Sequence, residues 1–171
     1  MSTATPVLPA ASAPGNAADT GGSRRPETLS VGGWVRRPLQ LDAPGLDAME
    51  WLAVNDFDVI CTLDGSHGVL PSVRTVRLCD LIDLAQPAFG QRTDFKRVAI
   101  VAEGAEGYRA LFSWAEVFNS PLGSGFVVAY ATAGSKLPER AGTFALLPRH
   151  DLATGPRYVR ELHSIELHKL W

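Results

Sequence analysis

The run GFVVAYA, residues 125–131, constrains the fold of this chain more than any other segment. Nearly all of it is apolar, and its valines and aromatic residues favour an extended conformation. A strand without a polar face needs cover on both sides. The run therefore predicts a central strand of a sheet.

Other strand signals lie on both sides of this run. Alternation over residues 57–64 places Phe57, Val59, Cys61 and Leu63 on one apolar face, which is the period of a half-buried strand. Residues 97–113 are typical of two strands joined by a glycine-flanked turn. Further strands are predicted over residues 28–35, 143–148 and about 157–167, and a loop is predicted over residues 65–71.

Three short helices complete the pattern. Helical spacing of apolar residues predicts one helix over residues 46–54 and a second from Leu78 to Ala85. Ser113 with Glu116 makes a capping box that opens a third helix. Because strands outnumber these helices, the sequence predicts a compact α+β domain with mixed or antiparallel sheets.

Composition excludes several classes of protein. The chain has 171 residues, 20% of them charged, with a formal net charge of -2. No global positive field would draw it to nucleic acid. No apolar run approaches the roughly 20 residues of a membrane span. No signal peptide is evident, so we expect a cytoplasmic protein, or a periplasmic one if the start is misassigned.

The first 27 residues differ in composition from the rest. They are rich in Ala, Pro, Ser, Thr and Gly and poor in large apolar groups, so we expect a disordered tail over residues 1–27. The folded domain is expected over residues 28–171.

Cys61 is the candidate metal ligand, and the sequence leaves two interpretations open. Its alternation with Phe57, Val59 and Leu63 favours a small buried core residue. Its position at the end of a strand, before a loop with glycine and histidine, also suits a thiolate ligand. Cys79 lies beside the apolar stripe of its helix and is interpreted as structural.

Basic residues gather around the turn Gly155-Pro156. Arg149, His150, Arg157 and Arg160 lie on either side of this turn, and convergence there would create an anion site. On the predicted strand, Arg157 and Arg160 point to opposite faces, so Arg157 is expected to form the site with Arg149 and His150. The alternative is a solvated arginine-rich hairpin.

The order of motifs over residues 29–168 resembles the molybdopterin-binding domain of the sulfite-oxidase-like oxidoreductases. The matching pieces are LSVGGWVRRPLQL, the strand ending in Cys61, VRLCDLIDLA, AEGYRALFSWAEV, VVAYATAGSKLPERAG, LLPRHD and GPRYVRELHSIEL. Where full-length enzymes of the family carry an aromatic residue and a glycine, this chain has Val73 and Thr75. It looks closer to the small single-domain relatives.

The resemblance implies a compact mixed α+β domain that holds a molybdopterin cofactor. It implies that Cys61 gives the thiolate ligand to molybdenum. It also implies that Arg149, His150, Arg157 and Arg160 hold the pterin phosphate.

Two functions follow. The first is a molybdopterin-dependent oxidoreductase that performs oxygen-atom transfer or reduction on a small oxyanion or oxide, with an electron-transfer protein as partner. The second is a non-catalytic module on the same fold that binds an anionic ligand or a protein.

Overall fold

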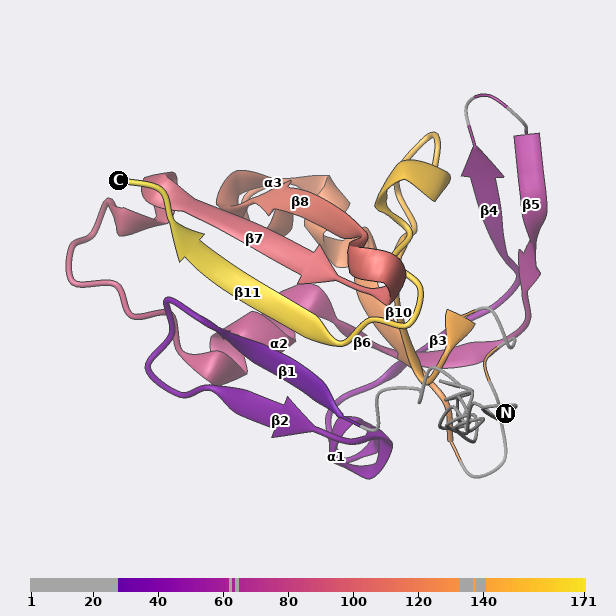
Figure 1. The fold of residues 1–171 in the computed structure, drawn as a ribbon, viewed down its shortest axis with the longest axis horizontal. Helices are drawn as coiled ribbons and strands as arrows, with labels where there is room; N and C mark the ends of the chain where they lie inside the picture. Colours follow the sequence, from indigo (N-terminus) through magenta and orange to yellow (C-terminus); the bar gives the residue numbers. More distant parts are fainter. Residues whose placement is uncertain (1–27, 62, 64, 133–136, 138–140) are drawn as a thin grey trace, which may run out of the picture.

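The computed structural model describes residues 28–61, 63, 65–132, 137 and 141–171, without the side chains of Cys61 and His67. The predicted tail, residues 1–27, lies outside the described residues. Helices and strands are mixed in an α+β arrangement, as the sequence predicts (Figure 1). None of the described helices is both long and apolar enough to span a membrane.

Eleven named strands form three sheets in the described part of the chain. The largest has the order β2 (Leu39–Leu41), β1 (Leu29–Gly33), β11 (Ser164–Lys169), β7 (Val98–Glu103) and β8 (Arg109–Ser113). The second has the order β10 (Phe144–Pro148), β9 (Phe126–Tyr130), β6 (Val73–Arg77) and β3 (Leu52–Val54). The third is the hairpin of β4 (Phe57–Cys61) and β5 (Gly65–Leu70). Three α-helices, α1 (Ala43–Asp47), α2 (Leu78–Ala85) and α3 (Trp114–Phe118), join them.

The five-stranded sheet is mixed because β1 and β11 run parallel while its other pairs are antiparallel. Gly33 ends β1 with a φ of +78°, and a Cβ there would lie 2.3 Å from the carbonyl oxygen of Leu167. Glycine is needed at this position because of both the positive φ and the close approach of β11.

The apolar run predicted as a central strand is β9, and it lies between β10 and β6. Phe126, Val128 and Tyr130 pack in the larger core between the sheets, with α2. Val127 and Ala129 pack in a second core on the opposite face, with Phe57 of the hairpin. Burial on both faces explains why this strand has no polar alternation.

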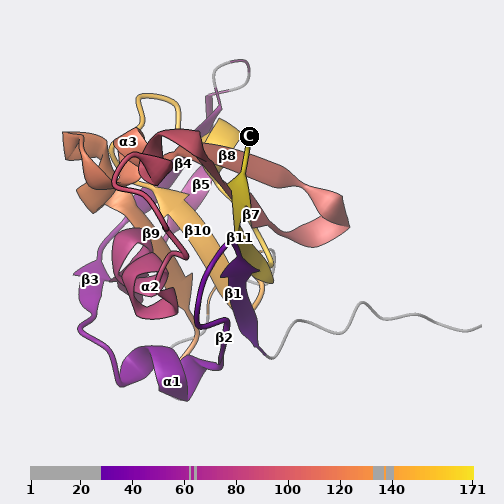
Figure 2. The ribbon, with the colours of Figure 1, turned by 90° about the vertical axis from the view of Figure 1, so that its left-hand side faces the viewer.

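Helices α2 and α3 confirm two of the three predicted helices. The predicted stripe of α2, Leu78, Leu81, Ile82 and Ala85, is fully buried. Figure 2 views α2 end-on beside β9 and β1. The capping box of Ser113 and Glu116 opens α3.

The predicted helix over residues 46–54 is wrong. The helix in this region is α1, which begins earlier because the Asp42 side chain caps the backbone N–H of Gly45 at 2.8 Å. It ends at Asp47, and residues 52–54 form β3, which pairs with β6 at the edge of the four-stranded sheet. The strand that pairs with β3 lies about 20 residues further along the chain, and a helical period within residues 46–54 gives no information about so distant a partner.

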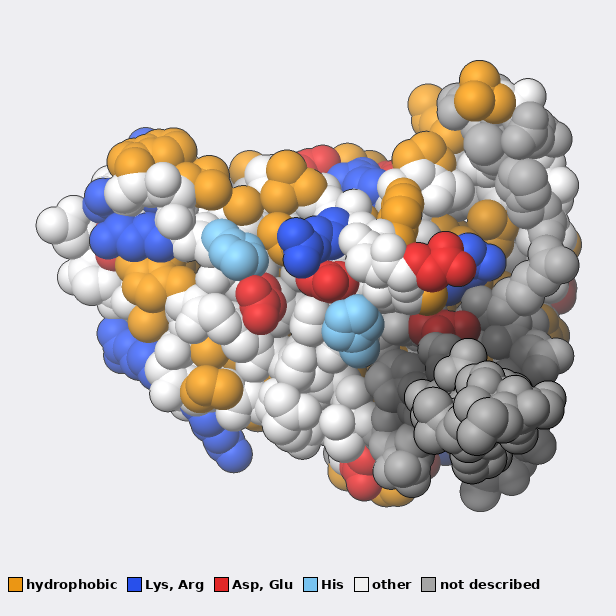
Figure 3. All heavy atoms as spheres, viewed as in Figure 1, with side chains coloured by type: hydrophobic (Ala, Val, Ile, Leu, Met, Phe, Trp, Pro, Cys, Tyr) orange, Lys and Arg blue, Asp and Glu red, His pale blue; other side chains and the backbone are white. Residues whose placement is uncertain are grey.

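The segment predicted as a loop, residues 65–71, is mostly strand. It forms β5 and pairs with β4 in a hairpin that projects from the body of the domain (Figures 1 and 3). Phe57 at the base of β4 is buried, but Leu63 near the tip is 89% exposed. Val59 is partly buried against the same core, so the predicted apolar face meets the core over the first part of β4 and leaves it toward the tip.

The predicted strand over residues 157–167 begins later than expected. A short 3-10 helix, Gly155–Arg157, precedes it, and β11 starts at Ser164. Glu161 between them has a φ of +47°, which interrupts an extended strand. The face assignment predicted for Arg157 and Arg160 is therefore wrong.

Candidate functional site

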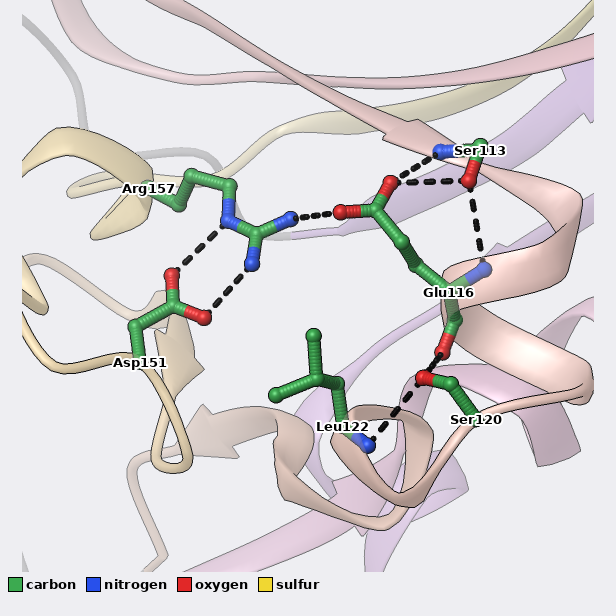
Figure 4. A network of polar contacts seen from close by, with 6 residues as sticks. All are labelled: Ser113, Glu116, Ser120, Leu122, Asp151 and Arg157. Atoms are coloured by element: carbon green, nitrogen blue, oxygen red, sulfur yellow. Dashed lines mark hydrogen bonds and ion pairs between the residues drawn. The ribbon is translucent and has the colours of Figure 1, made fainter.

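Arg157 is the most enclosed of the four predicted anion-binding residues. Its side chain is 20% exposed, and its guanidinium meets two carboxylates (Figure 4). Nε donates to Asp151 Oδ2 at 2.8 Å and Nη2 donates to Oδ1 at 2.5 Å, while Nη1 donates to Glu116 Oε1 at 2.8 Å. The hydrogen bond to Asp151 is the main reason that the pKa of Arg157 is raised above its ordinary value.

Aromatic rings and a helix N-terminus surround this guanidinium. Its central carbon lies 5.1 Å from the ring centre of Phe112 and 4.7 Å from that of Phe126, within cation–π range. Glu116 also accepts hydrogen bonds from the backbone N–H and the hydroxyl of Ser113, both at 2.8 Å. Burial raises the pKa of Glu116, but the bonds from Ser113 and Arg157 outweigh it and hold the pKa below its ordinary value. Arg157 therefore fastens its loop to α3.

Arg149 and His150 lie exposed at the end of β10. The backbone N–H of Arg149 donates to the carbonyl of Gly125 at 2.9 Å. His150 Nδ1 lies 3.2 Å from the carbonyl oxygen of Pro121. A Cβ on Gly125 would lie 2.5 Å from the His150 ring, so the missing side chain at Gly125 makes room for the histidine.

Arg160 is exposed, and its backbone is held against the turn between β7 and β8. Its carbonyl accepts a hydrogen bond from the N–H of Ala105 at 3.0 Å, and a Cβ on Gly104 would lie 2.1 Å from the same oxygen. Burial raises the pKa of the nearby Tyr158 to about 12, although the positive charge of Arg160 acts to lower it. Arg160 makes no side-chain ion pair with any described residue.

Cys61 ends β4, where its backbone pairs with Gly65. Its side chain lies outside the described part of the structure, so its role as ligand or core residue stays a prediction. The strand that carries it is tied to the arginine-bearing loop by one side chain. Thr154 accepts a hydrogen bond from the N–H of Ile60 at 2.7 Å and donates to the carbonyl of Asp58 at 2.9 Å.

Aromatic packing makes a second link between the same two segments. The rings of Phe57 and Tyr158 are 6.2 Å apart, with a 51° tilt between their planes. The structure thus brings the Cys61 strand next to the loop that carries Arg149, His150, Arg157 and Arg160. It does not make Arg157 an open donor, because its guanidinium faces α3 and two acids.

The sequence patterns did not reveal the residues that organise this region. Asp151 and Thr154 carry no motif, and Glu116 gave a signal only as a helix cap. The single usable clue is a carboxylate six residues before an arginine across a Gly-Pro turn.

A second polar cluster lies away from the loop, at the end of α1. Arg74 Nη1 donates to Asp47 Oδ1 at 2.6 Å, and the hydroxyl of Tyr130 donates to the same oxygen at 3.0 Å. Arg74 also lies over the ring of Trp51, 4.3 Å from its centre. Burial, with the bond to Asp47, raises the pKa of Tyr130. The cluster joins α1 to the four-stranded sheet.

Among the described residues, no three side chains of the His, Cys, Asp and Glu types gather into a group that could hold a metal ion.

The comparison with solved structures found a similar fold in the sulfane dehydrogenase SoxCD from Paracoccus pantotrophus. The TM-score is 0.55 and the identity is 15%, so the likeness concerns the fold. The match covers 82% of this chain, and this chain spans only 38% of the SoxCD chain. No protein-family model matches the sequence, and the search of curated proteins found no match.

Proposed function

We propose that this domain binds a molybdopterin-type cofactor beside the Cys61 strand and acts as an oxidoreductase on a small oxyanion or oxide. The fold likeness to a sulfane dehydrogenase supports a redox role. Such chemistry needs an electron donor or acceptor, and an electron-transfer protein is the partner that we propose for this role.

The observation that carries the proposal is the pair of hydrogen bonds at Thr154. They join a strand that ends in a cysteine to a loop rich in cationic side chains, although Ile60 and Thr154 are 94 residues apart in sequence. A cysteine-bearing strand held against a loop with several cationic side chains offers residue types that suit a thiolate-bound metal on an anionic organic cofactor.

Each residue has a proposed part. Cys61 gives the thiolate ligand, and the exposed Arg149, His150 and Arg160 bind the cofactor phosphate. Arg157 supports them by holding the loop to α3. Three of the five N–H groups of its guanidinium donate to Asp151 and Glu116, so its part is structural and the phosphate contacts come from the exposed side chains.

A bound molybdenum centre supplies two-electron redox chemistry, including oxygen-atom transfer. The chain contributes binding and orientation. Arginine suits the phosphate because its planar donors make charge-assisted hydrogen bonds, which are roughly twice as strong as neutral ones.

The test is to express the protein in a host that makes molybdenum cofactor and in a host that lacks it. We expect molybdenum and an oxidised fluorescent pterin to co-purify only from the first host, in near-equal amounts. Protein that carries neither, yet binds pyrophosphate in calorimetry, would instead be a non-catalytic anion-binding module.

A further inference from the structure

One edge of β4 has no strand beside it within the described part of the chain. β5 pairs with the other edge, and the register between them shifts between Asp58 and Ile60. In an extended strand, the carbonyl of one residue and the N–H of the residue two places on point to the same side. The carbonyl of Asp58 and the N–H of Ile60 therefore face outward together.

The hydroxyl of Thr154 occupies this edge. It accepts from the N–H of Ile60 at 2.7 Å and donates to the carbonyl of Asp58 at 2.9 Å, as the backbone of a neighbouring strand would. A hydroxyl has one donor hydrogen and two acceptor lone pairs, so it can satisfy both groups at once. Thr154 is only 5% exposed, which leaves little room for water to replace it.

The backbone around Thr154 is fixed to the body of the domain. Arg157, three residues later, is held by Asp151 and Glu116. The hydroxyl of Tyr108 donates to the carbonyl of Pro156 at 2.6 Å. Thr154 is therefore an anchored point against which the projecting hairpin is held.

We infer that Thr154 is a positioning residue that sets where the Cys61 strand lies relative to the arginine-bearing loop. This inference rests on the proposed function in one respect: its expected consequence is a change in cofactor loading. Its structural part, the restraint of the hairpin by one hydroxyl, is open to measurement without any cofactor.

Three variants separate this role from a general loss of stability. Thr154→Val keeps the shape and removes the hydroxyl, whereas Thr154→Ser keeps the hydroxyl. Thr75→Val is the matched control, because Thr75 is fully buried and its hydroxyl donates to the carbonyl of Leu52 at 3.0 Å, in the four-stranded sheet.

The first measurement is hydrogen exchange of the Ile60 amide by nuclear magnetic resonance on the full chain, with the β7 amide of Ile100 as internal reference. We expect Thr154→Val to speed Ile60 exchange by about tenfold or more relative to Ile100. Thr154→Ser should restore the wild-type ratio, and Thr75→Val should leave it unchanged. An unchanged ratio in Thr154→Val would overturn the inference.

The second measurement is the molybdenum-to-protein ratio of the same variants from a cofactor-competent host. We expect a large loss in Thr154→Val, recovery in Thr154→Ser and wild-type loading in Thr75→Val. Full loading of Thr154→Val would overturn the positioning role while leaving the proposed function intact. Wild-type protein without molybdenum would overturn the proposed function, and the exchange ratio would still decide whether Thr154 restrains the hairpin.

Discussion

Both carboxylate oxygens of Asp151 accept hydrogen bonds from the guanidinium of Arg157. The same arginine reaches Glu116 on α3, so one side chain joins the loop after β10 to a helix more than 30 residues earlier in the chain. Removal of this largely enclosed arginine leaves Asp151 without its guanidinium partner and leaves Glu116 with only its hydrogen bonds from Ser113. This arrangement makes the stability of the loop depend on Arg157.

Arg157→Ala should therefore destabilise the domain by about 2–4 kcal/mol in urea unfolding, through the lost ion pairs and the lost packing on Phe112 and Phe126. Arg109→Ala is the control, because Arg109 pairs with Glu103 but its side chain is 66% exposed. A surface pair of that kind contributes little to stability, because solvent screens it. Equal losses for the two variants would contradict the enclosed role of Arg157.

Acid should weaken the same contact. The pKa of Glu116 in the folded protein lies below its ordinary value of 4.5, so the folded state binds fewer protons there than the unfolded state. The stability that ionised Glu116 contributes is present above that ordinary value and is lost as the pH falls through the folded pKa. The difference in unfolding free energy between wild type and Glu116→Gln should thus be largest at neutral pH and shrink below about pH 4.5. A difference that stays constant down to about pH 3 would argue against this linkage.

Gly125 should not tolerate a side chain while His150 is present. Gly125→Ala is expected to cost about 1–3 kcal/mol in thermal or urea unfolding, because its Cβ would meet the His150 ring at 2.5 Å. The double variant with His150→Ala should recover most of that loss. Gly32→Ala is the control, since a Cβ there has no described neighbour within 4 Å, and we expect little change. A neutral Gly125→Ala would mean that the histidine does not pack there.

The exposed side chain of Arg160 should contribute directly to the affinity of the loop for anions. Arg160→Ala is expected to weaken pyrophosphate binding by about tenfold in calorimetry, in line with one charge-assisted contact. Added salt should weaken wild-type binding through screening. Arg92→Ala removes the same charge from an exposed loop elsewhere and should leave the affinity unchanged. Identical, salt-independent affinities in all three proteins would show that the loop has no anion site.

Local sequence patterns predicted those elements whose signal is local. The stripe of α2 and the capping box of α3 fix their helices through contacts three or four residues apart. The apolar run that forms β9 predicted a central strand, because both faces of that strand are apolar. In contrast, β3 and β5 are strands because of the segments they pair with, and no local period reveals a partner.

For the candidate site, too, the sequence predicted the local features and not the contacts between distant segments. The sequence placed Cys61 at a strand end and the basic residues at a turn, but it could not show which acids lie near each arginine. Arg157 meets Asp151 and Glu116 only after the 3-10 helix turns its side chain toward α3. The link through Thr154 likewise depends on a hairpin edge that has no sequence signature.

The most direct test of the central claim is the molybdenum-to-protein ratio of wild type, Cys61→Ser and Cys79→Ser, each purified from a cofactor-competent host. Cys79 is the matched control, because it is half-buried in α2 and its burial raises the pKa of its thiol. We predict molybdenum in wild type and in Cys79→Ser, and almost none in Cys61→Ser at an unchanged thermal midpoint. Wild-type protein free of molybdenum, or Cys61→Ser loaded to the wild-type level, would contradict the account.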